Sequence, residues 1–347
     1  MPRFPEEEIK RLKREISIER LCSYYGITLK PQGKNRVAHC PWHKDDTASF
    51  VVTPDKNLWH CMGACNTGGD VFTLVMKTEK VSFRHAAQIL QELSGTLPTE
   101  SEARPQKRGL KHSILVKSES SLSDTALLNH IIDFYHRSFL NDPGAMKYLE
   151  KRRCLTPQAV KRFKIGYANR TLCYRVPATT SSGKRLKSKL QSIGIYRQSG
   201  HEHLSGSVVF PIMDTEGNPV QMYGRKITTR LRKGTPEHLY LEKPLKGIWN
   251  YEGVLHQKEW ILCEAIIDAL TLWSNGFENV ITSYGKNNFT QDHLDLIRES
   301  SPNKVIIAYD NDDTGNKASE ALAKQLVLEG VNVHRALVPY GKDINGY

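Results

Sequence analysis

Hydrophobic and polar positions follow three successive patterns along the chain, and the first predicts a small mixed unit. Helical spacing predicts two short helices near the N-terminus, over residues 5–14 and 17–25. Over residues 35–59, short apolar runs separated by polar turns predict strands. Two more apolar helices are expected, one capped by Asp70 and one beginning at Ser82. Together these elements predict a compact α+β domain.

The second pattern follows a polar segment. Residues 96–122 are rich in Ser, Lys, Arg and Glu and have no hydrophobic periodicity, so we expect a linker there. A helix is expected over residues 124–140, and a later helix has Thr156 as its cap. Strand patterns dominate residues 165–249 and include a hairpin that turns at Gly217.

The third pattern alternates buried strands with amphipathic helices from residue 258 onward. Regular alternation of this kind predicts a parallel sheet with helices on both faces. The fold class expected for the whole chain is therefore α+β and multidomain, with an α/β C-terminal part. We expect the parts to be residues 1–95, 96–122, 123–257 and 258–347.

Charge adds a class of partner to this outline. The chain has 347 residues, with 49 Lys plus Arg against 37 Asp plus Glu, a formal charge of +12. From Glu264 onward there are 7 basic and 12 acidic residues, which leaves 42 basic and 25 acidic residues before it. A basic body predicts a polyanionic partner, with nucleic acid ahead of membrane. The acidic C-terminal part predicts a bound cation, such as a metal ion.

The sequence shows neither a transmembrane helix nor a secretory signal. No run of about 18 apolar residues is present, which argues against a transmembrane helix. The N-terminal stretch MPRFPEEEIKRLKRE lacks the apolar centre of a secretory signal. We therefore expect a cytoplasmic protein with no membrane partner, and the seven cysteines then predict metal binding rather than disulfides.

Three cysteines and one histidine have the spacing of a zinc ribbon. The predicted ligands are Cys40, His43, Cys61 and Cys65. Each pair of ligands lies at a turn between predicted strands, and Cys and His favour Zn²⁺ over Mg²⁺. Four protein ligands fill the coordination sphere, so the zinc is expected to be structural. His39 and His60 are alternative histidine ligands. The nearby Trp42, Phe50 and Trp59 either stack on a nucleic-acid strand or belong to the core.

Acidic residues gather at the predicted ends of the C-terminal strands. These residues are Glu264, Asp268, Asp310, Asp312 and Asp343. Loops at the carboxyl ends of neighbouring parallel strands converge on one crevice. Because uncompensated carboxylates repel one another, the cluster predicts Mg²⁺ or Mn²⁺, which stabilise in-line displacement at phosphorus. The alternatives are a simple helix-capping turn for Asp310 and Asp312, and a first-turn helix acid for Asp268.

These motifs, taken in order, resemble those of the bacterial DnaG-type primases. The Cys-x₂-His…Cys-x₃-Cys arrangement is similar to their CHC2 zinc-binding domain, and Glu264 with Asp310-x-Asp312 is similar to their Toprim domain. Between them, FKIGYANR, VVFPIMDTEGNPVQMYGRKI and HLYLEKPLKGIWN resemble the basic N-terminal part of the primase core. The resemblance assigns residues 1–95 to the zinc domain, 96–122 to a linker, 123–257 to this basic part and 258–347 to Toprim.

The resemblance implies a DNA-directed RNA polymerase of the primase type. This nucleotidyltransferase would synthesise short RNA primers for DNA replication from nucleoside triphosphates (NTPs) on single-stranded DNA, with structural Zn²⁺ and catalytic Mg²⁺ or Mn²⁺. It implies catalytic roles for Glu264, Asp310 and Asp312, and additional metal ligation by Asp268 and Asp343. Arg225, Lys226 and Tyr240 fall in the segment near nucleotide and template. A replicative helicase is expected to engage a C-terminal region that this chain lacks.

Three departures from the family pattern predict a divergent member, as in a phage or mobile element. Ala265 replaces the usual Gly, Asn345 replaces the second Asp of an Asp-Pro-Asp motif, and Glu242 stands where the family has Asn. The departures keep two alternatives open. One is a non-catalytic DNA-binding or scaffold protein with a decayed Toprim site, and the other is a Toprim nuclease.

Overall fold

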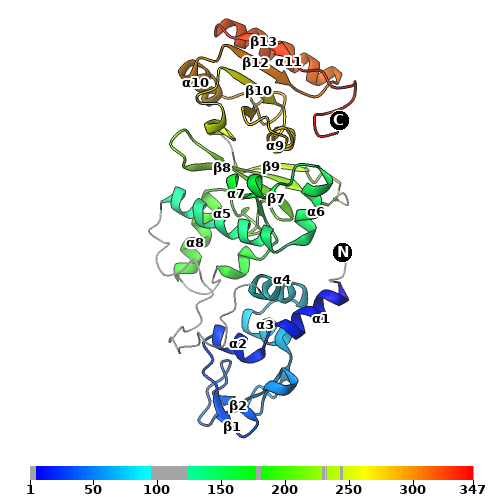
Figure 1. Ribbon diagram of the computed structural model, residues 1–347. Helices are drawn as coiled ribbons and strands as arrows, with labels where there is room; N and C mark the ends of the chain where they lie inside the picture. The colour runs from blue at the N-terminus through cyan, green and yellow to red at the C-terminus, as the bar shows by residue number, and fades with distance from the viewer. Residues whose placement is uncertain are drawn as a thin grey trace. The chain divides into compact units, whose positions relative to one another are not determined.

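The computed structural model divides into two compact units, each described here by itself (Figure 1). The described residues are 5–94, 123–176, 181–228, 231, 233–242 and 245–346. The first unit is Met1–Ser118 with Thr171–Leu186, and the second is Glu119–Arg170 with Lys187–Tyr347. The linker predicted over residues 96–122 lies outside the described residues.

The first unit contains an antiparallel sheet in which the strands follow chain order. The strands are β1 (Lys30–Gln32), β2 (Asn35–Ala38), β3 (Phe50–Thr53), β4 (Leu58–Cys61) and β5 (Gly68–Gly69). The helices are α1 (Glu6–Glu15), α2 (Ile18–Tyr24), α3 (Val71–Glu79) and α4 (Phe83–Ser94), with 3₁₀ turns η1 (Pro54–Lys56) and η4 (Leu172–Arg175). The predicted helices and strands of this unit are confirmed.

Local chemistry explains where these elements begin and turn. Asp70 caps α3, because its carboxylate accepts hydrogen bonds from the backbone N–H groups of Phe72 (3.0 Å) and Thr73 (3.1 Å). Asn57 has a positive φ of 53° after η1, a conformation that Asn tolerates better than most residues. Its side chain accepts from the Ile18 N–H at 2.7 Å, which ties the β3–β4 turn to the start of α2.

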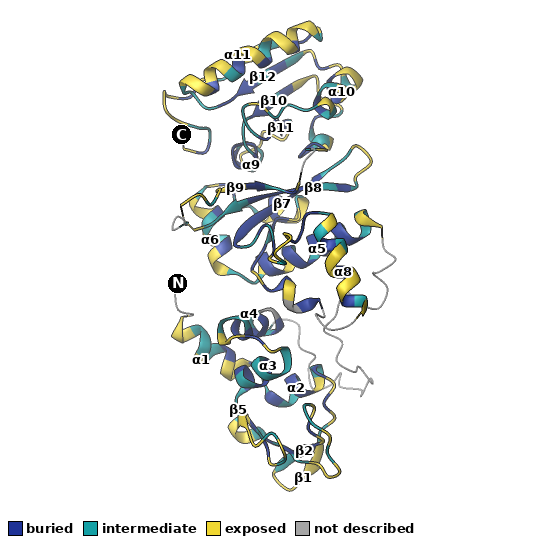
Figure 2. Ribbon diagram, turned by 180° about the vertical axis from the view of Figure 1, so that it is seen from behind, coloured by how far each residue is buried: buried dark blue, intermediate teal, exposed yellow. Residues whose placement is uncertain are grey.

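The second unit begins with an antiparallel sheet of order β6-β7-β8-β9. Its strands are β6 (Gly166–Tyr167), β7 (Ser207–Met213), β8 (Pro219–Lys226) and β9 (His238–Tyr240). The associated helices are α5 (Asp124–Leu140), α6 (Pro143–Lys151) and α7 (Pro157–Arg162). Figure 2 shows β7 as a largely buried strand, in agreement with burial of all but its last residue.

The predictions for this part of the chain are mostly confirmed. The hairpin turns at Gly217, which has a φ of 80°, and Thr156 accepts a hydrogen bond from the Ala159 N–H at 3.1 Å as the cap of α7. Helix α8 (Ser181–Ser192), which contributes residues to both units, was not predicted, because strand patterns dominate its surroundings. Leu186 and Leu190, four residues apart and both buried, are its hydrophobic signal.

The C-terminal part of the second unit is a parallel sheet of order β11-β10-β12-β13. The elements are β10 (Glu259–Cys263), α9 (Ile266–Ser274), β11 (Val280–Thr282), α10 (Gln291–Ser300), β12 (Lys304–Ala308), α11 (Asp313–Leu328) and β13 (Asn332–Arg335), preceded by the 3₁₀ turn η5 (Tyr251–Gly253). The predicted strand–helix alternation and parallel pairing are confirmed.

Helices cover both faces of this sheet. Residues of α9 share one buried cluster with α5, α6 and β7, so this face packs on the preceding part of the unit. Residues of α10 and α11 form a second cluster on the other face. Burial on both sides explains why the strands are almost continuously apolar. Among the described residues, no helix is long and apolar enough to span a lipid bilayer.

Candidate functional site

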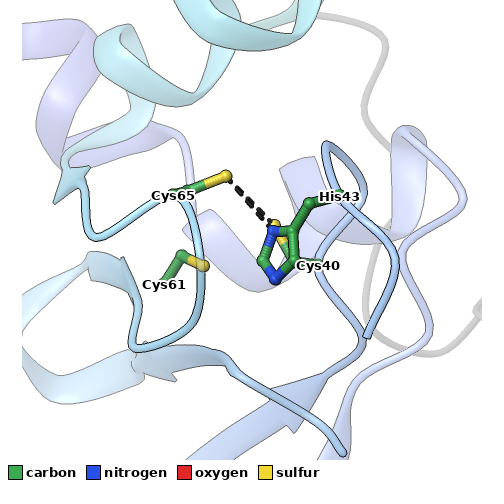
Figure 3. A group of neighbouring side chains, drawn as sticks. All are labelled: Cys40, His43, Cys61 and Cys65. Atoms are coloured by element: carbon green, nitrogen blue, oxygen red, sulfur yellow. Dashed lines mark hydrogen bonds between the residues drawn. The ribbon is translucent and has the colours of Figure 1, made fainter. Parts of the chain in front are cut away.

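A compact cluster of potential metal ligands lies in the first unit. Cys40 follows β2, Cys61 ends β4, and His43 and Cys65 lie in the turns after them. The ligating atoms of all four residues lie within 4.8 Å of one another. Figure 3 shows the four side chains converging, with His43 Nδ1 3.3 Å and Cys40 Sγ 3.7 Å from Cys65 Sγ.

These distances fit zinc. Two thiolates bound to one tetrahedral Zn²⁺ at about 2.3 Å lie about 3.8 Å apart, close to the spacing of Cys40 and Cys65. Burial raises the pKa of the Cys40 thiol, and a bound cation would compensate the charge of its thiolate. The group found among the described residues contains neither His39 nor His60, which favours His43 as the histidine ligand.

The aromatic residues beside the zinc cluster form part of the core. Phe50 and Trp59 are fully or almost fully buried, and their rings stack with centroids 5.3 Å apart. Trp42 is partly buried and packs on both, with centroid distances of 5.7 Å to Phe50 and 4.9 Å to Trp59. Of the two interpretations, core packing therefore holds for Phe50 and Trp59, and these rings are not exposed for stacking with bases.

The predicted acidic residues lie at the carboxyl end of the parallel sheet. Cys263 at the end of β10 is paired with Thr282 of β11 and Ala308 of β12, so the residues that follow these strands emerge together. Glu264 directly follows β10, and Asp310 follows β12 by two residues. Asp268 lies in the first turn of α9, and Asp343 lies in the loop beyond β13.

The acids interact through their charges. Burial, together with the charge of Asp310, raises the pKa of Glu264 to about 7. Burial, followed by the charges of Asp343 and Asp310, raises the pKa of Asp268 to about 7. The pKa of Asp310 is also raised, first by burial and then by Asp343. The predicted convergence of strand ends thus brings Glu264, Asp268, Asp310 and Asp343 into one repulsive cluster.

The acidic cluster suits a divalent cation, although its carboxylate oxygens are not all within ligand distance of one another. Among the described side chains, Glu264 Oε2 is a buried oxygen with no hydrogen-bond partner. A cation would compensate this atom and the repulsion that raises the neighbouring pKa values. The acidic oxygens do not form a group within mutual ligand distance, since the cysteine–histidine cluster is the one such group in the described part of the chain.

The Asp312 carboxylate has two sets of hydrogen-bond partners, at the start of α11 and on Lys286. Its carboxylate caps α11 by accepting the Gly315 N–H at 2.6 Å, as the helix-capping alternative expected. Lys286, in the loop after β11, donates to both Asp312 oxygens at 3.1 and 3.2 Å and to the Thr314 hydroxyl. Hydrogen bonds from Gly315, Thr314 and Lys286 hold the pKa of Asp312 at about 2. Lys286 is a site residue that sequence reasoning missed.

The Asn345 side chain is hydrogen-bonded to Arg152 and Thr271. Its Nδ2 donates to the Arg152 carbonyl oxygen and to the Thr271 hydroxyl, the latter at 2.9 Å. Its Oδ1 accepts from Arg152 Nη1 at 3.2 Å, and its backbone N–H donates to Asp268 Oδ1 at 3.1 Å. The Asn345 amide is therefore a buried connection between the end of α6, helix α9 and the C-terminal loop.

Arg225 of the antiparallel sheet connects through Tyr148 and Arg152 to the C-terminal loop that carries Asn345. Arg225 Nε donates to the Tyr148 hydroxyl at 3.3 Å, and the Arg152 guanidinium lies 5.4 Å from the centroid of the Tyr148 ring. Because Arg152 also donates to Asn345, contacts run without a gap from Arg225 to Asp268. Sequence reasoning missed Tyr148 and Arg152, for which the stretch Tyr148-Leu-Glu-Lys-Arg152 at the end of α6 was the available signal.

The three residues predicted near nucleotide and template do not share one face. Cross-strand pairing places Arg225 opposite His238 and Tyr223 opposite Tyr240, so Arg225 and Tyr240 lie on the same face of the sheet. Lys226, the next residue of β8, points to the opposite face and donates to the Ser205 carbonyl.

Lys226 has its own basic surroundings. Burial, together with the positive charges of Arg170 and Arg197, lowers the pKa of Lys226 to about 8. Tyr240 is anchored differently, because its hydroxyl donates to the Tyr284 carbonyl at 3.3 Å, beside the carboxyl end of β11. Arg225 and Lys226 therefore lie in different surroundings on opposite faces of the sheet.

Comparison with known proteins gives the family of each part. Three family models match in succession: the CHC2 zinc finger over residues 4–105, the N-terminal domain of the DNA primase catalytic core over 134–257, and a Toprim-like domain over 261–347. The fold and the two clusters thus define a zinc-ribbon and Toprim protein. The chain belongs to the family of DnaG-type DNA primases.

Individual relatives agree with this assignment. The chain is 30% identical to the DNA primase of Aquifex aeolicus, over 97% of this chain and 65% of that protein. It is 27% identical to the DNA primase of Halalkalibacterium halodurans, over 99% of this chain and 57% of that protein. The crystal structure of the Aquifex aeolicus primase zinc-binding and RNA polymerase domains is similar with a TM-score of 0.55 and 27% identity, covering 97% of this chain and 81% of that one. The chain spans less than two thirds of the length of these two curated relatives.

Proposed function

We propose that this chain binds single-stranded DNA and synthesises short RNA primers on it by metal-dependent nucleotidyl transfer from NTPs. The observation that supports this most strongly is the continuous set of contacts from Arg225 through Tyr148, Arg152 and Asn345 to Asp268. It joins cationic side chains, which suit triphosphate and template, to the carboxylates that suit a divalent metal. A solved primase catalytic domain bound to ssDNA has the same fold, with a TM-score of 0.53.

The domain roles follow the sequence predictions. We assign residues 1–95 to zinc and template binding, 123–257 to the basic part of the core, and 258–347 to the metal-binding Toprim domain. The predicted Mg²⁺ or Mn²⁺ would be held by Glu264, Asp310 and Asp312, with Asp268 and Asp343 supporting them. We place the reaction in the bacterial cytoplasm, where template and nucleotides occur together.

The chain's own residues have two kinds of role in this reaction. Acidic residues bind the metal ion, and basic residues bind phosphate groups. When bound, the divalent metal supplies Lewis-acid stabilisation of the triphosphate as pyrophosphate leaves. Glu264 and Asp310 provide carboxylate oxygens where charge is needed, and Arg152 and Arg225 provide guanidinium groups on the neighbouring surface. Lys226, with Arg170 and Arg197 nearby, supplies phosphate contacts for a template strand on the other face of the sheet.

The test is primer synthesis on mixed-sequence single-stranded DNA with labelled ribonucleotides and Mg²⁺ or Mn²⁺. Wild type should yield short products, and Glu264→Gln and Asp310→Asn should abolish them while template binding persists. Asp313→Asn is the matched control, because Asp313 is an exposed acid in the same turn that bonds Tyr340 instead of facing the cluster. Loss of product in the control as well would point to disrupted folding rather than to loss of the metal site.

A non-catalytic, template-binding protein is the second candidate. Asn345 favours it, because its side chain bonds Arg152 and Thr271 where the family pattern has a carboxylate. Wild-type protein that binds template, yet yields no product with either metal, would support this function and overturn the first.

A further inference from the structure

Asp45 lies beside the zinc cluster without belonging to its four ligands. It is in the loop between His43 and β3, and its side chain is 6% exposed. One oxygen, Oδ2, accepts from the Cys40 backbone N–H at 2.7 Å and from the Ser49 hydroxyl at 2.6 Å. The other, Oδ1, contacts His43 Nε2. The Ser49 hydroxyl in turn lies 3.6 Å from Cys61 Sγ, so the carboxylate contacts two of the four ligand residues directly and a third through Ser49.

The two nitrogens of His43 have separate partners. Nδ1 faces the cluster at 3.3 Å from Cys65 Sγ, whereas Nε2 faces Asp45 (Figure 3 shows the ring among the three cysteines). A carboxylate only accepts hydrogen bonds, so Nε2 carries the proton and donates. In a neutral imidazole this leaves the Nδ1 lone pair directed at the cluster, which is the form that binds a metal. The contact with Asp45 therefore selects both the ring orientation and the tautomer.

Packing holds this arrangement closed. Gly63, in the turn between Cys61 and Cys65, approaches the ring so closely that a Cβ there would lie 2.8 Å from both His43 Nε2 and Ser49 Oγ. The backbone of this turn thus packs closely against the His43 ring and Ser49, beside the Asp45–His43 contact. The same close approach explains why the position is glycine.

We propose that Asp45 is a positioning residue of the zinc site, which orients His43 as an Nδ1 ligand and fixes the loop that carries Cys40. Partners behind the metal ligands commonly change metal affinity by about 10- to 100-fold when removed. The inference depends on the zinc cluster alone, so it stands or falls independently of primer synthesis.

The experiment compares zinc affinity in the full chain by competition with a chromogenic chelator. Asp45→Asn should weaken Zn²⁺ binding by about 10- to 100-fold. Asp46→Asn is the matched control, because it makes the same change of charge and type at an exposed neighbouring position, and it should bind zinc like wild type. Equal affinity in Asp45→Asn and wild type, or equal weakening in both variants, would overturn the proposal.

A double-mutant cycle separates positioning from general destabilisation. In a His43→Cys background no imidazole remains to be oriented, so Asp45→Asn should cost much less zinc affinity than it does in wild type. The absorption spectrum of bound Co²⁺ should change for Asp45→Asn and stay unchanged for Asp46→Asn. If Asp45→Asn costs the same with and without His43, Asp45 does not act through the imidazole, and the proposal that it orients His43 fails. Circular dichroism at saturating zinc checks that the compared variants are folded.

Discussion

The backbone N–H of Asn345 donates a 3.1 Å hydrogen bond to Asp268 Oδ1, which fastens the C-terminal loop to the first turn of α9. The Asn345 side chain extends the connection to Arg152 and Thr271. The family pattern has a carboxylate at this position, and here the amide acts as a donor to two oxygen atoms. The departure from the family pattern at Asn345 therefore changes the hydrogen bonds that support the acidic cluster as well as the number of its carboxylates.

Asn345→Asp should destabilise the chain instead of restoring a metal ligand. An aspartate has no N–H to donate to the Arg152 carbonyl and the Thr271 hydroxyl, and it adds a negative charge beside Asp268. We expect the free energy of unfolding in urea to fall by about 1–3 kcal/mol. Asn332→Asp, at an exposed position on β13, should leave it nearly unchanged. Tighter Mn²⁺ binding with unchanged stability would contradict this account.

Lys286→Met should tighten the binding of Mn²⁺. The Lys286 ammonium bonds both oxygens of Asp312 and also lowers the pKa of Glu264 through its charge, so it competes with an added cation. Because the ion pair is partly exposed, we expect a gain of about two- to fivefold in affinity, measured by electron paramagnetic resonance titration. Lys317→Met removes the same charge from an exposed position on α11 and is the control. Weaker binding in Lys286→Met alone would show that the lysine supports the metal site.

Arg225→Met and Lys226→Met should have different effects, although the residues are adjacent. Lys226 lies on the face with Ser205, Arg170 and Arg197, so its loss should weaken DNA binding and reduce the salt dependence by about one unit of slope. Arg225 connects to the acidic cluster through Tyr148, so its loss should reduce nucleotide incorporation more than template binding. Fluorescence anisotropy over a salt series and steady-state kinetics measure the two effects. Equal loss of DNA binding and nucleotide incorporation in both variants would contradict separate roles for the two faces of the sheet.

Acidification should destabilise the Toprim part through His293. His293 is fully buried, its Nε2–H donates to the Thr282 carbonyl, and its Nδ1 accepts from the Thr290 N–H. Burial lowers its pKa to about 4, below the ordinary value of about 6.5. Above pH 6.5 both folded and unfolded states hold neutral imidazole. As the pH falls toward 4, the unfolded state binds the proton first, and stability is lost.

The size of this effect is measurable at mild pH. Between pH 7.5 and pH 5, His293 should account for a loss of roughly 2 kcal/mol in the free energy of unfolding. His293→Gln, which has no titrating group, should be less stable at pH 7.5 but should lose less on acidification. Urea unfolding of both proteins at the two pH values provides the comparison, and parallel pH dependences would show that other groups dominate.

Local signals in the chain were enough to predict most elements and both clusters of chemistry. Helix α5 and the cap at Thr156 follow from periodicity and capping residues, which act over a few neighbouring positions. The zinc ligands follow from spacing, because short strands bring consecutive turns together. The convergence of Glu264 and Asp310 follows from strand–helix alternation, since that pattern dictates parallel strands with aligned ends.

Tertiary structure decided how side chains from distant segments meet. The contact of Asn345 with Arg152 joins positions 193 residues apart, and no local pattern reports such a pairing. The face occupied by Lys226 depends on the register of β8, because a shift of one residue would exchange it with Arg225. Burial likewise decided that Phe50 and Trp59 belong to the core, since an aromatic residue suits both a core and a base-stacking surface. Residue type and spacing thus determined which chemistry is present, whereas packing over long sequence distances determined which atoms are brought together to use it.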